Sequence, residues 1–237
     1  FIMALPKLNT PTYELVLPSN GEKIKYRPFL VREQKVLLMA QESNNDDEIA
    51  NAMGDIVRTC TFDTVDPNVS PMFDIEYIFL KVRGKSAGET VDLTLTCPDD
   101  NKTKVQVRLN LDDINCQMTM EHTNEIKLSN DVKMMLRYPL LKDMKGVLGS
   151  QNDIDRVFFV LNKCVTEIHY GDKIYNRVDI TDKEMNDFID SMSNAQLESV
   201  MNFFDSMPKL RHAIKVTNPN TKVKSEVVLE GLTSFLE

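Results

Sequence analysis

The sequence predicts an α+β protein: an N-terminal hairpin, helices and an antiparallel β region, followed by a helical C-terminal region with a closing β-hairpin. Three observations lead to this prediction. Apolar residues alternate with polar ones near both ends and in the middle, as in half-buried strands. Between these stretches, apolar residues recur at every third or fourth position, as on the buried face of a helix. Two Ser/Thr-x-x-Glu/Gln patterns in the last third are typical of helix starts.

A hairpin and three helices come first. An alternating stretch begins at Tyr13, and the turn Asn20-Gly21 connects it to a second alternating stretch that ends at Tyr26. Helical spacing then covers three ranges: Val31 to about Gln41, Asp46–Cys60 and about Met72–Val82. The third helix is apolar all round, which predicts that it is buried on both sides or covered by a partner.

The middle of the chain is predicted to be β-structure. Alternating apolar residues run through 91–95 and 105–111 with a turn between them, and shorter strand-like stretches follow. Residues 138–152 are ambiguous, with a helical segment before the break at Gly149-Ser150. We therefore predict an N-terminal α+β region with the central β-hairpin at 1–148 and a helical C-terminal region with the terminal β-hairpin at 149–237.

Helical stripes dominate the last third. Asn152 can cap a helix whose apolar face ends with Val165, and a short hairpin with the turn Gly171-Asp172 follows. Two capping patterns start the next helices: Thr181 with Glu184, and Ser193 with Gln196. Pro208 stops the second of these helices. A β-hairpin from about Ala213 to Leu229 and a short apolar tail close the chain.

One short sequence pattern occurs twice. Thr96-Cys97-Pro98-Asp99 resembles Thr217-Asn218-Pro219-Asn220, and each lies between two strand-like stretches. The two hairpins look like zinc-ribbon knuckles without their ligands, since the first keeps one cysteine and the second none. A tetrahedral zinc site needs about four nitrogen or sulfur ligands. The sequence therefore predicts no zinc.

Composition argues against several classes of partner. The chain has 28 basic and 36 acidic residues, a formal charge of −8. Nucleic-acid binding and attraction to anionic membranes both need clustered Lys and Arg, so we expect neither partner. No apolar run approaches the roughly 20 residues that a membrane span requires. With no secretory leader recognised, the four scattered cysteines are expected to be reduced thiols.

Two motifs of serine enzymes match only as strings. Gly84-Lys85-Ser86-Ala87-Gly88 fits G-x-S-x-G, but a helix precedes it and a strand follows, the reverse of a nucleophile elbow. Ser206 and Lys209 fit S-x-x-K, but Pro208 breaks the helical turn that would bring them together. We predict no enzyme, no catalytic, cofactor-binding or metal residues and no small-molecule substrate. The alternative is an enzyme whose site is assembled from distant residues, with Ser86 as the first candidate nucleophile.

Apolar surface for protein partners is the remaining signal. The chain has 13 Met and no Trp, and flexible Met side chains suit cores and interfaces that repack. The adjacent Phe203-Phe204 and the terminal Phe235-Leu236 are hard to bury all at once in a small domain. The predicted partner-binding residues are Met72, Phe73, Tyr77, Phe203, Phe204, Met207, Pro208, Phe235 and Leu236. We expect deletion of 235–237 to leave a folded protein that assembles poorly.

Several segments resemble one protein family. Residues 3–13 and 26–33 resemble the opening of the baseplate hub assembly proteins of T-even-type contractile-tailed bacteriophages, and four later segments match the same pattern: 71–81, 96–100, 207–212 and 229–235. The resemblance covers nearly the whole chain. It implies a non-enzymatic protein whose partners are other phage baseplate hub proteins, located in the host cytoplasm during assembly or in the virion tail baseplate. Two alternatives remain open: a structural subunit, or an assembly chaperone absent from the mature virion.

Overall fold

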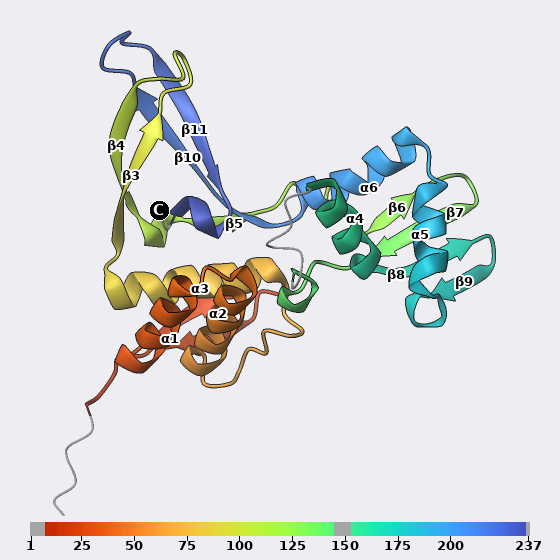
Figure 1. Ribbon diagram of the computed structural model, residues 1–237, viewed down its shortest axis with the longest axis horizontal. Coiled ribbons are helices and arrows are strands. Elements are labelled where there is room, and N and C mark those ends of the chain that lie inside the picture. Colours follow the sequence, from red (N-terminus) through yellow and green to blue (C-terminus); the bar gives the residue numbers. More distant parts are fainter. Residues whose placement is uncertain (1–7, 145–152, 236–237) are drawn as a thin grey trace, which may run out of the picture.

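The structure is a computed structural model that describes residues 8–144 and 153–235, with the side chains of the second range from residue 156 on. Its buried apolar side chains form two separate clusters, which define two lobes (Figure 1). The N-terminal lobe consists of 8–117 and 209–235, and Leu141 also belongs to its core. The C-terminal lobe consists of 125–136 and 153–206. The chain is α+β, as predicted.

The N-terminal lobe is built around one long helix. A hairpin of β1 (Tyr13–Val16) and β2 (Lys23–Tyr26) precedes α1 (Val31–Glu42), α2 (Asp46–Cys60) and α3 (Met72–Ala87). As its all-round apolar sequence predicts, α3 is buried on two sides, with α2 below it and the sheets above it in Figure 1. The helix continues beyond the expected end at Val82, because nothing breaks it before Gly88, whose φ of 123° suits glycine.

Two hairpins rise side by side above α3 (Figure 1). One pairs β3 (Thr90–Thr96) with β4 (Lys104–Asn110), and the short helix η1 (Leu111–Asp113) follows it. The other pairs β10 (Lys209–Thr217) with β11 (Lys224–Glu230), and β10 also pairs with β5 (Asn115–Gln117). The short helix η4 (Leu232–Phe235) then packs against α3.

The repeated sequence pattern forms the same turn at both hairpin tips. The Asn101 N–H donates to the Cys97 carbonyl at 3.0 Å, and the Lys222 N–H donates to the Asn218 carbonyl at 2.9 Å. The buried Asn218 side chain also bonds across to the other tip, with Nδ2 3.0 and 3.1 Å from the two Asp99 carboxylate oxygens. Side-chain hydrogen bonds therefore join the two tips directly.

The C-terminal lobe is a four-stranded antiparallel sheet with helices packed on it. The strands are β6 (Glu125–Lys127), β7 (Val132–Leu136), β8 (Val165–Tyr170) and β9 (Lys173–Asn176), in that spatial order. The helices are α4 (Asp153–Cys164), α5 (Asp182–Asp190) and α6 (Asn194–Ser206), with the short helix η3 (Arg177–Asp179) before α5. Both predicted capping boxes are confirmed. Val165 begins β8 and does not extend α4, and the predicted cap Asn152 lies outside the described residues.

The division between the lobes differs from the predicted boundary at residue 148. Strands β6 and β7 belong to the C-terminal lobe because β7 pairs with β8. The closing hairpin belongs to the N-terminal lobe because β10 pairs with β5. Both pairings join segments far apart in sequence, so local patterns do not reveal them. Residues 137–144, which include η2 (Leu141–Met144), contact both lobes.

Candidate interaction surface

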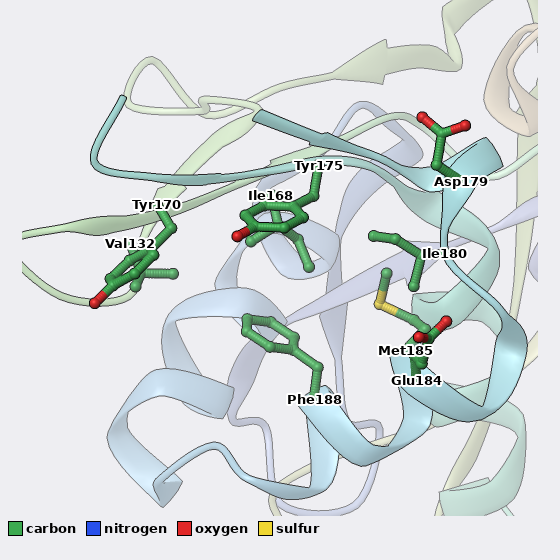
Figure 2. Close-up of a pocket in the computed structure, with 9 residues that line it drawn as sticks. All are labelled: Val132, Ile168, Tyr170, Tyr175, Asp179, Ile180, Glu184, Met185 and Phe188. Carbon is green, nitrogen blue, oxygen red and sulfur yellow. The ribbon is translucent and has the colours of Figure 1, made fainter. Parts of the chain in front are cut away.

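An open apolar pocket lies at one end of the C-terminal lobe, between the sheet and α5 (Figure 2). Its volume is about 430 Å³. Nine residues from β7, β8, β9, η3 and α5 line it: Val132, Ile168, Tyr170, Tyr175, Asp179, Ile180, Glu184, Met185 and Phe188. Seven of the nine are apolar or aromatic, and such linings are typical of surfaces that receive an apolar group.

Strand register explains the wall formed by the sheet. Ile168 and Tyr170 are two residues apart on β8, so their side chains lie on the same face. Ile168 pairs with Tyr175 on β9, and Tyr170 pairs with Val132 on β7. The same face continues inward to Met134, which is completely buried in the lobe core. The pocket is therefore an open end of the layer between sheet and helices.

Helix α5 forms the opposite wall. The Thr181 hydroxyl accepts from the Glu184 N–H at 3.2 Å, and the Glu184 carboxylate accepts from the Thr181 N–H at 2.9 Å, which fixes the helix start. Met185 then falls in the core and Phe188 is half-buried. In Figure 2 the Phe188 ring points from α5 toward the strands that carry Ile168 and Tyr175.

Arg177 fixes the segment that connects the two walls. Its guanidinium donates to the Ile180 carbonyl at 2.6 Å and to the Asn162 side-chain oxygen at 2.7 Å, and it also bonds to Asp182. These bonds hold η3 and so position Asp179 and Ile180 at the pocket. The apolar side chain of Ile180 and the carboxylate of Asp179 are therefore held in place on one side of the pocket.

The charged groups that line the pocket are both acidic. Glu184 is engaged in its capping box, and hydrogen bonds from Thr181 lower the pKa of the Glu184 carboxyl. Asp179 is exposed and has no hydrogen bond or ion pair to any described residue. The hydroxyl groups of Tyr170 and Tyr175 are likewise without a partner among the described residues. The Asp179 carboxylate and the two tyrosine hydroxyl groups are therefore available to bond a partner beside the apolar lining of the pocket.

Exposed apolar side chains continue from the pocket onto the surface. Tyr170, Tyr175 and Val178 are between 44% and 91% exposed, and we call these three residues the apolar rim. A second group of exposed apolar residues lies in the N-terminal lobe on α1 and includes Leu38 and Met39. Large apolar groups gathered on a surface commonly mark a protein interface.

The predicted partner-binding residues that the structure describes are divided between buried and half-buried positions. Phe73, Phe203, Pro208 and Phe235 are buried, so Phe203 and Phe235 are buried at the same time, contrary to our expectation for this pair. Phe235 is buried in the core of the N-terminal lobe and Phe203 in the core of the C-terminal lobe, so the two rings do not compete for the same space. Met72, Tyr77, Phe204 and Met207 are half-buried, and their role toward partners stays a prediction. Leu236 lies outside the described residues.

Two of these residues connect the lobes of the same chain. Phe73 on α3 packs edge-on against Tyr138, and Tyr138 stacks with Phe203 on α6, with ring centroids 5.0 and 5.8 Å apart. His122 lies against the same pair, 5.5 Å from Tyr138 and 5.0 Å from Phe203. Phe73 and Phe203 are therefore apolar because they pack, through Tyr138, where the two lobes meet.

The serine candidates occupy structural positions. The Ser86 hydroxyl donates to the Val82 carbonyl at 2.5 Å and accepts from the Phe29 N–H at 2.9 Å. The Ser206 hydroxyl lies 2.9 Å from His122 Nδ1, a contact that the sequence pattern did not suggest. Burial lowers the pKa of His122, and its Nε2 has no partner among the described residues. A third group that would orient the imidazole is therefore missing from the described part of the chain.

Metal and membrane signals are also absent from the described residues. Across 8–144 and 153–235, no group of three or more His, Cys, Asp and Glu side chains is placed to hold a metal ion. Cys60, Cys97 and Cys164 are buried and Cys116 is half-buried, all as free thiols. No helix in this part of the chain has the length and apolar character needed to cross a membrane.

Comparison with known proteins identifies the family. The chain matches the family model described as T4 bacteriophage base plate protein over residues 10–237. The match extends from β1 through η4 and so includes both lobes. No curated protein and no solved structure matches the chain. The resemblance is thus confirmed at the level of the phage baseplate, and the chain belongs to the T4 bacteriophage base plate protein family.

Proposed function

We propose that this protein is a non-catalytic baseplate hub protein that binds other hub proteins through the pocket and the apolar rim. The observation that carries the proposal is the continuous apolar surface from the core-lining Met185 to the exposed Tyr170 and Tyr175. Burying such surface contributes about 25 cal/mol per Å² before the cost of association is subtracted. Aromatic residues such as these tyrosines are enriched at protein interfaces.

Two features support the non-catalytic part of the proposal. Ser86, the first candidate nucleophile, uses its hydroxyl to bond backbone groups near the end of α3. Ser206 and His122 lie in contact, but the aromatic rings of Tyr138 and Phe203 flank the imidazole. This environment favours packing between the lobes over proton transfer.

A pairwise binding experiment tests the proposal. The full chain is co-expressed with each hub protein of the same phage, and the complexes are measured after purification. We expect stable binding to at least one of them. Replacing Tyr170, Tyr175 and Val178 together by serine should weaken that binding at least tenfold. The matched control replaces Val31, Leu38 and Met39 on α1 by serine and should leave the affinity within about twofold.

Other outcomes would contradict the proposal. If no hub protein binds the unmodified chain, the hub role is wrong. If the α1 variant loses binding and the rim variant keeps it, the interface lies on the N-terminal lobe.

Mass spectrometry of purified virions separates the two forms of the proposed role. A structural subunit remains in the particle at a fixed stoichiometry. A chaperone is found in infected cells during assembly and is missing from the finished virion.

A further inference from the structure

We propose that the C-terminal lobe binds an extended partner segment that pairs with β9 as a fifth strand and carries both apolar residues and Lys or Arg on the face turned toward the pocket. This inference rests on the proposed function, because it specifies how the pocket and the apolar rim engage a hub protein. It commits to one occupant, a basic and apolar strand of another protein. The geometry of the sheet edge, the side chains on it and the charges beside it support this choice.

The outer edge of β9 is available for pairing. β9 is the last strand of the sheet, and no described strand lies on its other side. The two-residue turn Gly171-Asp172 makes Tyr170 and Lys173 the pair that closes the hairpin. Bonded and non-bonded pairs alternate in such a ladder, so the N–H and C=O groups of Ile174 point away from β8. These are the groups that an added strand would bond.

The opposite edge of the sheet is protected. On β6 the exposed residues are Glu125 and Lys127, and Glu125 pairs with Lys133 of β7 at 2.7 Å. Charged residues and short length are common ways to prevent pairing at a sheet edge. β9 also exposes one charged residue, Lys173, but it presents Ile174, which is 59% exposed, and Tyr175, which is 44% exposed. The two edges therefore differ in their suitability for an added strand.

The lining of the pocket indicates which side chains the partner strand should carry. A strand beside β9 places alternate side chains on the face of Tyr175, which also carries Ile168. Apolar side chains on that face extend the pocket lining. Asp179 has no partner among the described residues, and Glu184 is the other charged group in the lining. Both are negative and lie on the pocket side, so a Lys or Arg of the partner finds a complementary charge when it stands two residues from an apolar residue and shares its face.

A defined peptide tests strand addition on the full-length protein. The probe is an acetylated and amidated octapeptide in which valine and lysine take turns at the odd positions and serine fills the even positions, so that valine and lysine share one face of the strand. One matched peptide carries glutamate in place of lysine, and another is the lysine peptide with all of its backbone amides N-methylated. Binding is followed by backbone amide signals in ¹H–¹⁵N spectra. We expect the lysine peptide to shift the signals of Ile174, Asn176 and Asp179.

The matched peptides separate the contributions to binding. The glutamate peptide should bind at least tenfold more weakly at low salt, because it meets two carboxylates. The N-methylated peptide should also bind at least tenfold more weakly, because the methyl groups remove donors and block close approach of the strands. The inference is overturned if signals shift only elsewhere or not at all, or if either matched peptide binds within about twofold of the probe.

A variant links the peptide result to the natural partner. Ile174→Pro removes the outward N–H of β9 and should weaken hub-protein binding at least tenfold, whereas Ile174→Val should stay within about twofold. If I174P retains full hub-protein binding, strand addition is wrong and the proposed function stands. If the peptide binds at β9 but no hub protein binds the chain, the proposed function fails and the edge-strand mechanism stands.

Discussion

The two lobes differ in how they use polar groups at their sheet edges. In the N-terminal lobe, Asn218 joins the two hairpin tips, and Arg108 pairs with Asp92 across β3 and β4 at 2.7 Å. In the C-terminal lobe, the edge strand β9 exposes Ile174, and Asp179 beside it has no partner among the described residues. The hairpin tips of the N-terminal lobe bond their polar groups to each other, whereas Asp179 beside β9 stays without a partner among the described residues. Stability and binding should therefore respond to different substitutions.

The largest effect is expected in the core of the N-terminal lobe. Phe235 is completely buried there, although it lies near the end of the sequence. Phe235→Ala should lower the free energy of unfolding by about 3–5 kcal/mol, because it removes apolar contacts and leaves a cavity. Urea unfolding followed by circular dichroism measures this change. Leu8→Ala, at a position that is 92% exposed, is the control and should change the stability by less than about 0.5 kcal/mol.

The same measurement tests whether Phe235 contributes to folding or only to assembly with a partner. The structure replaces our expectation that residues 235–237 are dispensable for folding, since Phe235 packs in the core. If Phe235→Ala unfolds at the same urea concentration as the parent, the buried position of this ring is incorrect.

A second prediction concerns a carboxyl group under η4. Burial raises the pKa of Glu76 on α3 to about 7, although the Leu232 N–H donates to its carboxylate. The folded protein therefore holds this proton more tightly than the unfolded chain does. The stability from this group is present below about pH 4.5 and is lost as the pH rises through about 7, by up to roughly 3 kcal/mol.

Glu76→Gln should remove this part of the pH dependence. The free energy of unfolding is measured between pH 4.5 and 7.5 for the parent, for E76Q and for Glu198→Gln, an exposed control on α6. The parent and E198Q should become less stable relative to E76Q as the pH rises. Parallel curves for all three proteins would show that Glu76 titrates alike in the folded and unfolded states.

A smaller effect is expected at the hairpin tips. Asn218 is 1% exposed and its Nδ2 also lies 3.0 Å from an Asp100 carboxylate oxygen. Asn218→Ala should cost about 1–3 kcal/mol, because it leaves hydrogen-bonding groups without a partner. It should also speed hydrogen exchange at both tips. Asn220→Ala, in the same turn but exposed, should cost less, and the reverse order would contradict the joining role of Asn218.

The smallest effect on stability is expected at the pocket. Asp179→Asn should change the free energy of unfolding by less than about 0.5 kcal/mol, because the carboxylate has no partner to lose. It should nevertheless weaken hub-protein binding, and less so at high salt. The comparison variant is Asp182→Asn, which loses ion pairs with Arg177 and Lys163. A larger loss of stability in D179N than in D182N would assign Asp179 a structural role.

Local features of the fold were predictable from sequence. The capping boxes at Thr181 and Ser193 involve residues three positions apart, so the sequence contains the complete interaction. The same holds for the hairpin around Asn20-Gly21. The pairing of β10 with β5 depends on segments about ninety positions apart, and no local pattern encodes it. This pairing places the closing hairpin in the N-terminal lobe, and we did not predict that placement.

The candidate site was predictable only in part. The alternation at Ile168 and Tyr170 and the turn that follows indicate a short hairpin, which the structure confirms. Its apolar residues do not reveal whether a further strand covers them, because that depends on the position of β9 in the sheet. Phe203 and Phe235 were chosen as binding residues because they are apolar, but burial can use the same property.

The interleaved path of the chain has a consequence for protein synthesis. Residues 125–206 contain every strand and helix of the C-terminal lobe, whereas the N-terminal lobe needs β10, β11 and η4. The ribosome therefore synthesises every element of the C-terminal lobe before it makes the strands that complete the other sheet. Until β10 is made, β5 lacks its strand partner. A released chain that ends before residue 209 would therefore contain every element of the proposed binding surface, joined to an N-terminal lobe that lacks one of its hairpins.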